Sequence, residues 1–192
     1  GQDLILHVDA TLQQAASDAL ADRRGTIVAI EPSTGGILAL VSKPSYDPNL
    51  FVAGIDHKTY AGLLDSVDLP LFNRAIQGQY EPGSTIKPII GMAGLATGIV
   101  SSDYVISDPG WFQLPNDERL YRDWNWRTVG TGGHGEVNLQ KAIYRSCNVY
   151  FYELAVKLGI SRIHEYLALF GFGTNTALDL PEARPGLLPS AS

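Results

Sequence analysis

The hydrophobic positions near the start of the chain follow the spacing of an amphipathic helix. Residues 11–24 place apolar side chains on one face, with Asp9 or Thr11 as a capping residue and Gly25 as a stop. A different pattern follows in "TIVAIEPSTGGILALVSK", where two apolar, β-rich runs flank a Pro-Ser-Thr-Gly-Gly turn. This pattern predicts a β-hairpin with strands at 26–30 and 37–41.

The later hydrophobic pattern is helical. Residues 84–97 are apolar on nearly every side, which predicts a buried helix ended by Gly98. Three further helices are predicted at 138–146, 149–158 and 161–170. The intervening segments, 43–80 and 99–137, are rich in Gly and Pro and show little period, so we expect loops there, with short helices in the first. The fold class is therefore α+β.

One hairpin is too little sheet for this number of helices. A two-stranded sheet is marginal in isolation, and runs without charge are typical of strands covered on both faces and paired at both edges. We therefore expect the chain to be part of a larger domain. An apolar sheet edge left open in this way favours dimers or strand exchange.

The composition is that of an ordinary globular protein and narrows the function only by exclusion. Hydrophobic residues make up 45% and charged residues 18% of the 192 positions, and the net charge is -6. No run of Lys and Arg occurs, so nucleic acid is not an expected partner. No apolar stretch has the length of a membrane span, and residues 1–20 lack a signal-peptide pattern.

The stretch "YEPGSTIKP", residues 80–88, places Ser84 and Lys87 one helical turn apart. Ser84 as a helix cap and Lys87 as a solvated surface residue are the common interpretations of such a pair. The predicted helix is otherwise buried, however, so Lys87 must point into an apolar body or a cleft. Burial lowers the pKa of a lysine, and a base of that kind can activate a serine hydroxyl.

A second polar cluster, Ser146-Cys147-Asn148, lies where two predicted helices meet. Alone, Ser146 and Asn148 would be helix caps. Together, S-x-x-K followed some sixty residues later by S-x-N resembles the serine acyltransferases that comprise penicillin-binding proteins and β-lactamases. Longer strings resemble the class B penicillin-binding protein 2 family of cell elongation. These strings are "LALVSKPSYDPNLF", "PLFNRAIQGQYEPGSTIKP", "DPGWFQLP", "SCNVYFYELAVKLGI" and "LDLPEARPGLLPS".

The resemblance implies a penicillin-binding protein/serine β-lactamase-like fold and a D,D-transpeptidase that cross-links peptidoglycan stem peptides. Ser84 would attack the penultimate D-Ala carbonyl, or a β-lactam, and form an acyl-enzyme. Lys87 and Ser146 would move protons, and Asn148 would bind the substrate amide. The sequence leaves open whether Lys87 or Ser146 is the principal base.

The resemblance also implies a location and partners. The whole protein would be periplasmic and anchored to the bacterial inner membrane, and it would work with a SEDS-family glycosyltransferase and elongasome proteins. Residues 1–192 would be part of the transpeptidase domain, without the anchor and pedestal and without the K-[ST]-G element, since neither Lys-Thr-Gly nor Lys-Ser-Gly occurs. A fragment without this element should be soluble and impaired or inactive, because an oxyanion-hole donor is worth roughly 10²–10³ in rate.

A zinc site is a further implication. The irregular stretch before the S-x-N motif carries Asp108, Asp123 and His134, and Cys147 lies within the motif. As a lone residue, Cys147 is more simply a small buried thiol. The penicillin-binding protein 2 family has an Asp, Asp, His, Cys site, however, and these four types make a borderline-soft ligand set suited to structural zinc. The Gly-rich loop "RTVGTGG" before His134 could vary in length without moving the ligands.

Two other functions compete with the transpeptidase. A β-lactamase or a β-lactam-sensing domain would share S-x-x-K, and a β-lactamase needs a carboxylate to activate water. The sequence offers Glu153, Glu165, Asp179 and Glu182, and their setting singles out none of them. The second competing hypothesis is a structural module that docks partners and has no catalytic activity.

Overall fold

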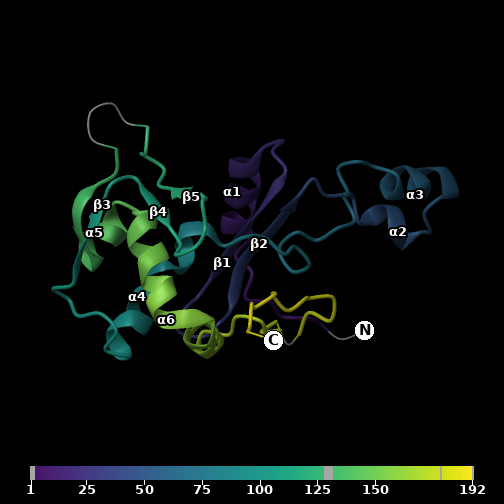
Figure 1. Ribbon diagram of the computed structural model, residues 1–192. Helices are drawn as coiled ribbons and strands as arrows, with labels where there is room; N and C mark the ends of the chain where they lie inside the picture. The colour runs from purple at the N-terminus through teal and green to yellow at the C-terminus, as the bar shows by residue number, and fades with distance from the viewer. Residues whose placement is uncertain (1–2, 128–131, 178, 192) are drawn as a thin grey trace. The chain divides into compact units, whose positions relative to one another are not determined.

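A computed structural model describes residues 3–127, 132–177 and 179–191. The chain divides into two compact units, residues 1–79 with 177–184, and residues 80–176 with 185–192. Figure 1 shows the elements of each unit. Each unit has a hydrophobic cluster of its own, and the larger cluster belongs to the second unit.

The first unit is built on a helix that packs against a hairpin. Helix α1 (Ala10–Leu20) contacts both β1 (Gly25–Ile30) and β2 (Ile37–Lys43), which pair antiparallel as predicted. The short helices α2 (Asn49–Val52) and α3 (His57–Leu64) follow, as expected for this segment. Ala16, Ala39 and Val41 form the cluster between α1 and the hairpin.

Two details of this unit differ from the sequence prediction. Helix α1 ends at Leu20 instead of residue 24, because Ala21 has a positive φ of 47° that stops the helix. The hairpin is covered by α1 on one face, whereas Val28 and Ile30 on β1 are 42% and 55% exposed. Within the described residues, therefore, the strands are covered on one face and paired along one edge.

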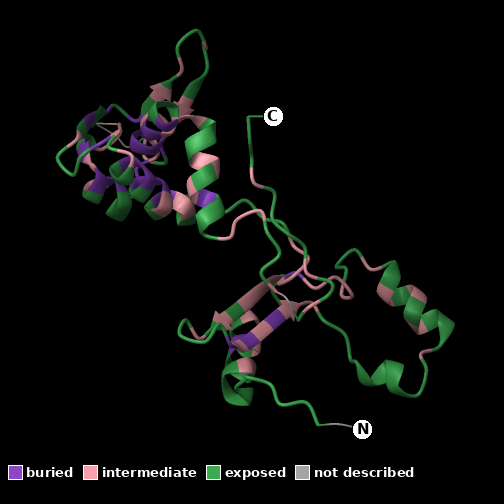
Figure 2. Cartoon of the chain, turned by 90° about the horizontal axis from the view of Figure 1, so that it is seen from below, coloured by how far each residue is buried: buried purple, intermediate pink, exposed green. Residues whose placement is uncertain are grey.

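The second unit combines helices with two small antiparallel ladders. Strand β3 pairs with β6, and β4 pairs with β5. The elements are η1 (Gly83–Ile86), α4 (Lys87–Ala96), β3 (Val105–Asp108), β4 (Trp111–Gln113), β5 (Leu120–Arg122), β6 (Gly135–Asn138), α5 (Leu139–Tyr144) and α6 (Asn148–Leu169). Figure 2 shows that buried residues gather in this helical unit.

The α+β class is right, but the sequence prediction missed the four strands that lie between residues 105 and 138. These strands are three or four residues long and interrupted by turns, too short for alternation to be recognised. Residues 128–131 of the Gly-rich loop lie outside the described residues. The segment labelled α6 covers two predicted helices, which are separated by a kink at Gly159 (φ 74°, ψ 159°), the predicted stop.

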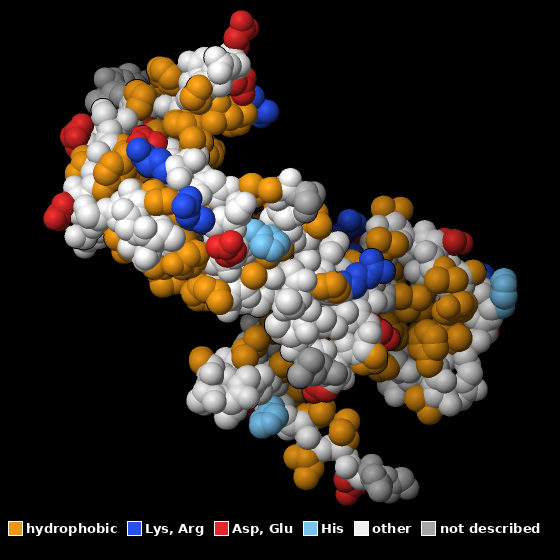
Figure 3. Space-filling model, turned by 60° about the horizontal axis from the view of Figure 1, so that its bottom comes forward, with side chains coloured by type: hydrophobic (Ala, Val, Ile, Leu, Met, Phe, Trp, Pro, Cys, Tyr) orange, Lys and Arg blue, Asp and Glu red, His pale blue; other side chains and the backbone are white. Residues whose placement is uncertain are grey.

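Helix α4 is buried on one side only, although its sequence predicts burial nearly all round. Ile90 and Ala93 are in the core, while Met92 and Leu95 are 45% and 43% exposed. Hydrophobic side chains reach the surface elsewhere too, as the space-filling view shows (Figure 3). A search of the described residues finds no helix with both the length and the apolar character to cross a membrane.

Helices α4 and α6 pack against each other, and Gly94 of α4 lies directly against Leu154 of α6. A Cβ atom at this position would lie 2.9 Å from both Leu154 Cδ1 and Val100 Cγ2. Leu154 is 1% exposed and Val100 is 4% exposed, so neither side chain has room to move away. The absence of a side chain at residue 94 therefore sets the separation of the two helices that carry the polar site.

We predict that Gly94→Ala destabilises the second unit by about 1–3 kcal/mol through overpacking, although alanine is the better helix former. Gly62→Ala in α3 is the matched control, because a Cβ there would meet nothing within 4 Å. That variant should gain up to about 1 kcal/mol from helix propensity. Denaturant unfolding of both variants measures the difference, and an equal effect at the two sites would contradict this packing argument.

Candidate active site

Ser84 lies in a tight turn directly before α4. The turn is the 3₁₀ segment η1, which Pro82 precedes and in which Gly83 has a φ of 56°. Ser84 is exposed, and its Oγ is 2.9 Å from Ser146 Oγ. Its hydroxyl thus contacts another side chain, 62 residues away, instead of capping the helix.

Lys87, at the start of α4, points into the protein and is 9% exposed. Its Nζ donates to Ser146 O at 2.8 Å, to Ser146 Oγ at 3.1 Å and to Asn148 Oδ1 at 2.7 Å. The ring of Phe151 lies 5.5 Å from the same nitrogen. Burial lowers the pKa of Lys87, against smaller opposing effects of Asp123 and Cys147, so the neutral amine is more accessible than in an exposed lysine.

Ser146 occupies a strained backbone position between α5 and α6. Its φ of 52° is left-handed, a conformation that glycine adopts far more readily. Ser146 N donates to Ile143 O at 3.1 Å and Cys147 N donates to Ala142 O at 2.9 Å, which is the hydrogen-bond pattern of a Schellman C-cap. The sequence thus keeps a hydroxyl where helix termination favours glycine, and strain of this kind clusters at functional sites.

The residues after Ser146 begin α6. Cys147 is the N-cap, and its Sγ accepts from Tyr150 N at 3.4 Å. Asn148 is the first residue of the helix and donates its backbone N–H to Asp123 Oδ2 at 2.9 Å. Because the Asn148 oxygen accepts from Lys87, both amide hydrogens of its side chain remain available as donors.

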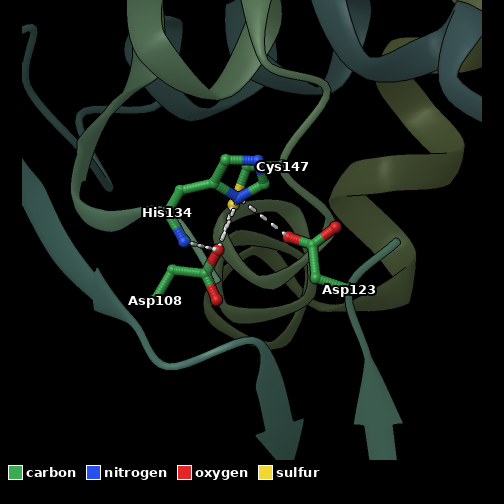
Figure 4. A group of neighbouring side chains, drawn as sticks. All are labelled: Asp108, Asp123, His134 and Cys147. Carbon is green, nitrogen blue, oxygen red and sulfur yellow. Dashed lines mark hydrogen bonds and ion pairs between the residues drawn. The ribbon is translucent and has the colours of Figure 1, made fainter. Parts of the chain in front are cut away.

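A second cluster lies behind the S-x-N motif and contains Asp108, Asp123, His134 and Cys147. Figure 4 shows the four side chains turned toward one another. Their ligand atoms all lie within 4.8 Å of one another. Asp108 Oδ2 is 2.7 Å from His134 Nδ1 and 3.3 Å from Cys147 Sγ, and His134 Nδ1 is 3.3 Å from Asp123 Oδ2.

The small ladders of the second unit bring these four residues together. Asp108 ends β3 opposite Gly135, which places it beside His134. Asp123 directly follows β5. Its N–H donates to Gly110 O at 2.8 Å, and this hydrogen bond extends the β4–β5 pairing. Gly133 has a φ of 84°, and a Cβ there would collide with the backbone of Gly110 and Asp108, so the chain enters the cluster through a position that requires glycine.

The cluster has the chemistry of a small metal site. Asp108, Asp123 and Cys147 are 2%, 1% and 0% exposed, so two carboxylates and a thiol share one dry space. Tetrahedral zinc with bonds of about 2.0–2.3 Å would separate its ligand atoms by roughly 3.3–3.8 Å. The separations here run from 2.7 Å to at most 4.8 Å, a range that includes these values. Hydrogen bonds from His134 and Gly110 hold the pKa of Asp108 below its ordinary value, although burial opposes them. The donor set therefore fits a structural cation.

The structure brings all eight residues singled out in the sequence into these two clusters, which Asp123 connects. Three further residues were missed. Phe151 lies under Lys87, Lys141 Nζ donates to His134 O at 2.8 Å, and the Trp124 indole N–H donates to Arg145 O at 3.1 Å. Only Phe151 had a usable signal, since three residues after Asn148 is the same helix face.

The carboxylates considered for water activation are engaged elsewhere or exposed. Glu153 accepts from the Tyr104 hydroxyl and lies 3.6 Å from Lys157 Nζ. Glu165, Asp179 and Glu182 are exposed. None of the contacts described for these four residues involves Ser84.

Comparison with known proteins identifies the family. The profile described as "Penicillin binding protein transpeptidase domain" matches residues 25–192. The chain belongs to this family. The predicted penicillin-binding protein transpeptidase fold is thereby confirmed, and the relatives named below confirm the resemblance to penicillin-binding protein 2.

Individual relatives of this transpeptidase-family chain are similar over almost its whole length. It is 54% identical over 190 residues to the peptidoglycan D,D-transpeptidase MrdA of Acinetobacter baumannii, covering 99% of this chain and 28% of that protein. The structure of Pseudomonas aeruginosa PBP2 in complex with WCK 5153 matches with 54% identity and a TM-score of 0.91, covering 99% of this chain and 42% of that one. Helicobacter pylori PBP2 in complex with MreC matches with 32% identity and a TM-score of 0.86, covering 95% and 33%.

The left-handed φ of Ser146 predicts a difference in stability between two variants at this position. Ser146→Gly and Ser146→Ala both remove the hydroxyl, but only glycine relieves the left-handed φ. We expect the glycine variant to be more stable than the alanine variant by about 1 kcal/mol. Thermal unfolding of the pair measures this, and equal stabilities would show that the backbone at residue 146 relaxes without cost.

Proposed function

We propose that the chain is the nucleophile-bearing part of a D,D-transpeptidase that cross-links peptidoglycan stem peptides. The observation that supports this most directly is the hydrogen-bonded series from Ser84 Oγ to Ser146 Oγ to Lys87 Nζ. A serine hydroxyl is a poor nucleophile without a base, and this series gives its proton a path to a buried amine. The names of the relatives point to the same activity.

The reaction proceeds in two steps. Ser84 Oγ attacks the carbonyl carbon of the penultimate D-Ala while its proton passes toward Ser146 and Lys87. The C–N bond to the terminal D-Ala then breaks, and the nitrogen that leaves takes up a proton from the same pair. An amine of a neighbouring stem then attacks the ester carbonyl and gives a proton to the Ser146–Lys87 pair. The C–O bond to Ser84 breaks, and Ser84 Oγ takes up a proton from that pair. A β-lactam follows the first step through its ring C–N bond and leaves the serine acylated.

Each polar residue has a role that its contacts support. Lys87 is the proton store, because burial lowers its pKa. Ser146 touches both Ser84 and Lys87 and is therefore the relay, so Lys87 acts on Ser84 through Ser146. The Asn148 side chain, held through its oxygen by Lys87, offers its N–H groups to a substrate carbonyl.

We also propose that Asp108, Asp123, His134 and Cys147 hold a structural zinc ion. A bound ion would neutralise two buried carboxylates and stabilise the fold. Its effect on catalysis would be indirect, because Asp123 also accepts from the Asn148 backbone and Cys147 is the neighbour of Ser146.

The whole protein would be periplasmic, anchored to the inner membrane and part of the machinery of cell elongation and shape. Its substrates would be D-Ala-D-Ala stem peptides, and its inhibitors would be β-lactams. The Helicobacter pylori structure with MreC supports partners of the elongasome type, and a SEDS-family glycosyltransferase is the proposed enzymatic partner.

The rival functions receive less support from the contacts. A β-lactamase would require a carboxylate near Ser84, and Glu153 is instead bonded to Tyr104 and Lys157. Rapid β-lactam turnover by the full-length protein would revive that alternative. A purely structural module would have no need for the strained Ser146.

We predict that a β-lactam acylates Ser84 in the full-length protein that carries this chain. Intact mass should rise by one β-lactam per chain, and peptide mapping should place the addition on residue 84. The rate should increase with pH through the folded-state pKa of Lys87, below the ordinary 10.5, because only the neutral amine accepts a proton.

The controls separate nucleophile from base. Ser84→Ala should abolish labelling, and Lys87→Arg should keep the positive charge while removing the rise with pH. Labelling at any other residue, or full labelling of Ser84→Ala, would refute the assignment. The isolated 192-residue chain, without K-[ST]-G, should be acylated roughly 10²–10³ times more slowly.

We predict close to one zinc ion per chain in protein purified without chelator. Cys147→Ser and His134→Ala should each lower the zinc content and the thermal stability, since binding energy in a structural site is folding energy. His164→Ala is the matched control, because the contact of His164 with Pro189 O involves none of the four cluster residues. Metal-free protein with a freely reactive Cys147 would refute the site.

A further inference from the structure

Two neighbouring residues hold the chain on either side of Ser146. Asp123 Oδ2 accepts from Asn148 N at 2.9 Å, and the Trp124 indole N–H donates to Arg145 O at 3.1 Å. The two contacts lie one residue before Ser146 and two residues after it. Both come from the segment that follows β5.

Trp124 is fixed in place although it is a surface residue. Its side chain is 64% exposed, yet its nitrogen is bonded to Arg145 O and its ring lies 5.6 Å from the His134 ring at 59°. An exposed tryptophan held at two points contributes little burial energy to the core. Its two contacts instead join the cluster behind the S-x-N motif to the end of α5.

The bond to Arg145 matters because of the geometry of Ser146. Peptide units are planar, so φ and ψ of Ser146 are set by the orientations of the two peptide planes that meet at its Cα. In the second plane, Ser146 O accepts from Lys87 Nζ and Cys147 N donates to Ala142 O. In the first plane, Ser146 N donates to Ile143 O, and the remaining group is Arg145 O.

We propose that Trp124 is a positioning residue for the relay serine. Its indole N–H fixes the first peptide plane and so maintains the left-handed φ that keeps Ser146 Oγ between Ser84 Oγ and Lys87 Nζ. Without this donor the plane can rotate toward ordinary φ values, and Ser146 Oγ leaves the position from which it contacts both groups. The inference rests on the proposed acyl transfer for its kinetic consequence but not for its structural one.

The test replaces Trp124 with phenylalanine in the full-length protein, which keeps an aromatic ring beside His134 and removes the donor. With a chromogenic cephalosporin, the first-order acylation constant should fall about five- to tenfold, as expected for one lost hydrogen bond. The dissociation constant of the non-covalent complex should stay the same. Trp126→Phe is the matched control, because the Trp126 ring contacts the guanidinium groups of Arg122 and Arg127.

A structural readout accompanies the kinetics. Hydrogen exchange at the Ser146 and Cys147 amides should become faster in Trp124→Phe and remain unchanged in Trp126→Phe. Zinc content should be equal in both variants and in the parent. Together these results support positioning through the backbone, independently of any loss of the metal.

Several outcomes would overturn the inference. The positioning role would be excluded by an unchanged acylation constant, whether or not the non-covalent complex is weaker. Unchanged amide exchange would also exclude it. Loss of zinc in Trp124→Phe would place the effect at His134 instead. If the parent protein is not acylated at Ser84, the proposed function fails, and the exchange measurement alone still decides whether Trp124 holds Ser146.

Discussion

The second unit depends on one buried amino group, that of Lys87. Lys87 Nζ is held by three acceptors, two on Ser146 and one on Asn148, and these bonds connect the start of α4 to the junction of α5 and α6. A buried lysine is costly unless its donors are satisfied. The chain satisfies them with the groups that the proposed chemistry uses, so the contact that organises the helices is also the contact that links base and relay. Structure and reactivity cannot be altered separately at this point.

Two backbone features, in addition to side-chain packing, arrange the helices around this contact. The missing side chain at Gly94 brings α4 against α6, and the left-handed turn at Ser146 lets α5 end and α6 begin within a few residues. Behind the turn, the β3–β6 and β4–β5 ladders carry Asp108, Asp123 and His134 to one point. The pairing of these short strands thus places three side chains from distant parts of the chain beside one another.

The sequence made the long elements and the motif residues predictable. Helices, the first hairpin and the buried Lys87 follow from periodicity, and the eight site residues follow from motif spacing and family resemblance. The early end of α1 was not predictable, because the positive φ of Ala21 has no signature in the local sequence. The four short strands were not predictable either, since paired residues lie 7 to 33 positions apart in a segment without alternation. Contacts such as Trp124 to Arg145 depend on that pairing, so they became visible only in three dimensions.

The contacts of Asp123 restrict which residues can replace it. Its Oδ1 accepts from Trp124 N at 2.7 Å, while Oδ2 accepts from Asn148 N and lies beside His134. Asparagine has nearly the same shape but only one acceptor oxygen, and its NH₂ would face a backbone N–H donor on one side. Glutamate would keep both oxygens but displace them by a methylene into a space with no room for it. Asparagine and glutamate, the two residues most similar to aspartate, are therefore both disfavoured at position 123, for structural reasons that do not depend on the chemistry at Ser84.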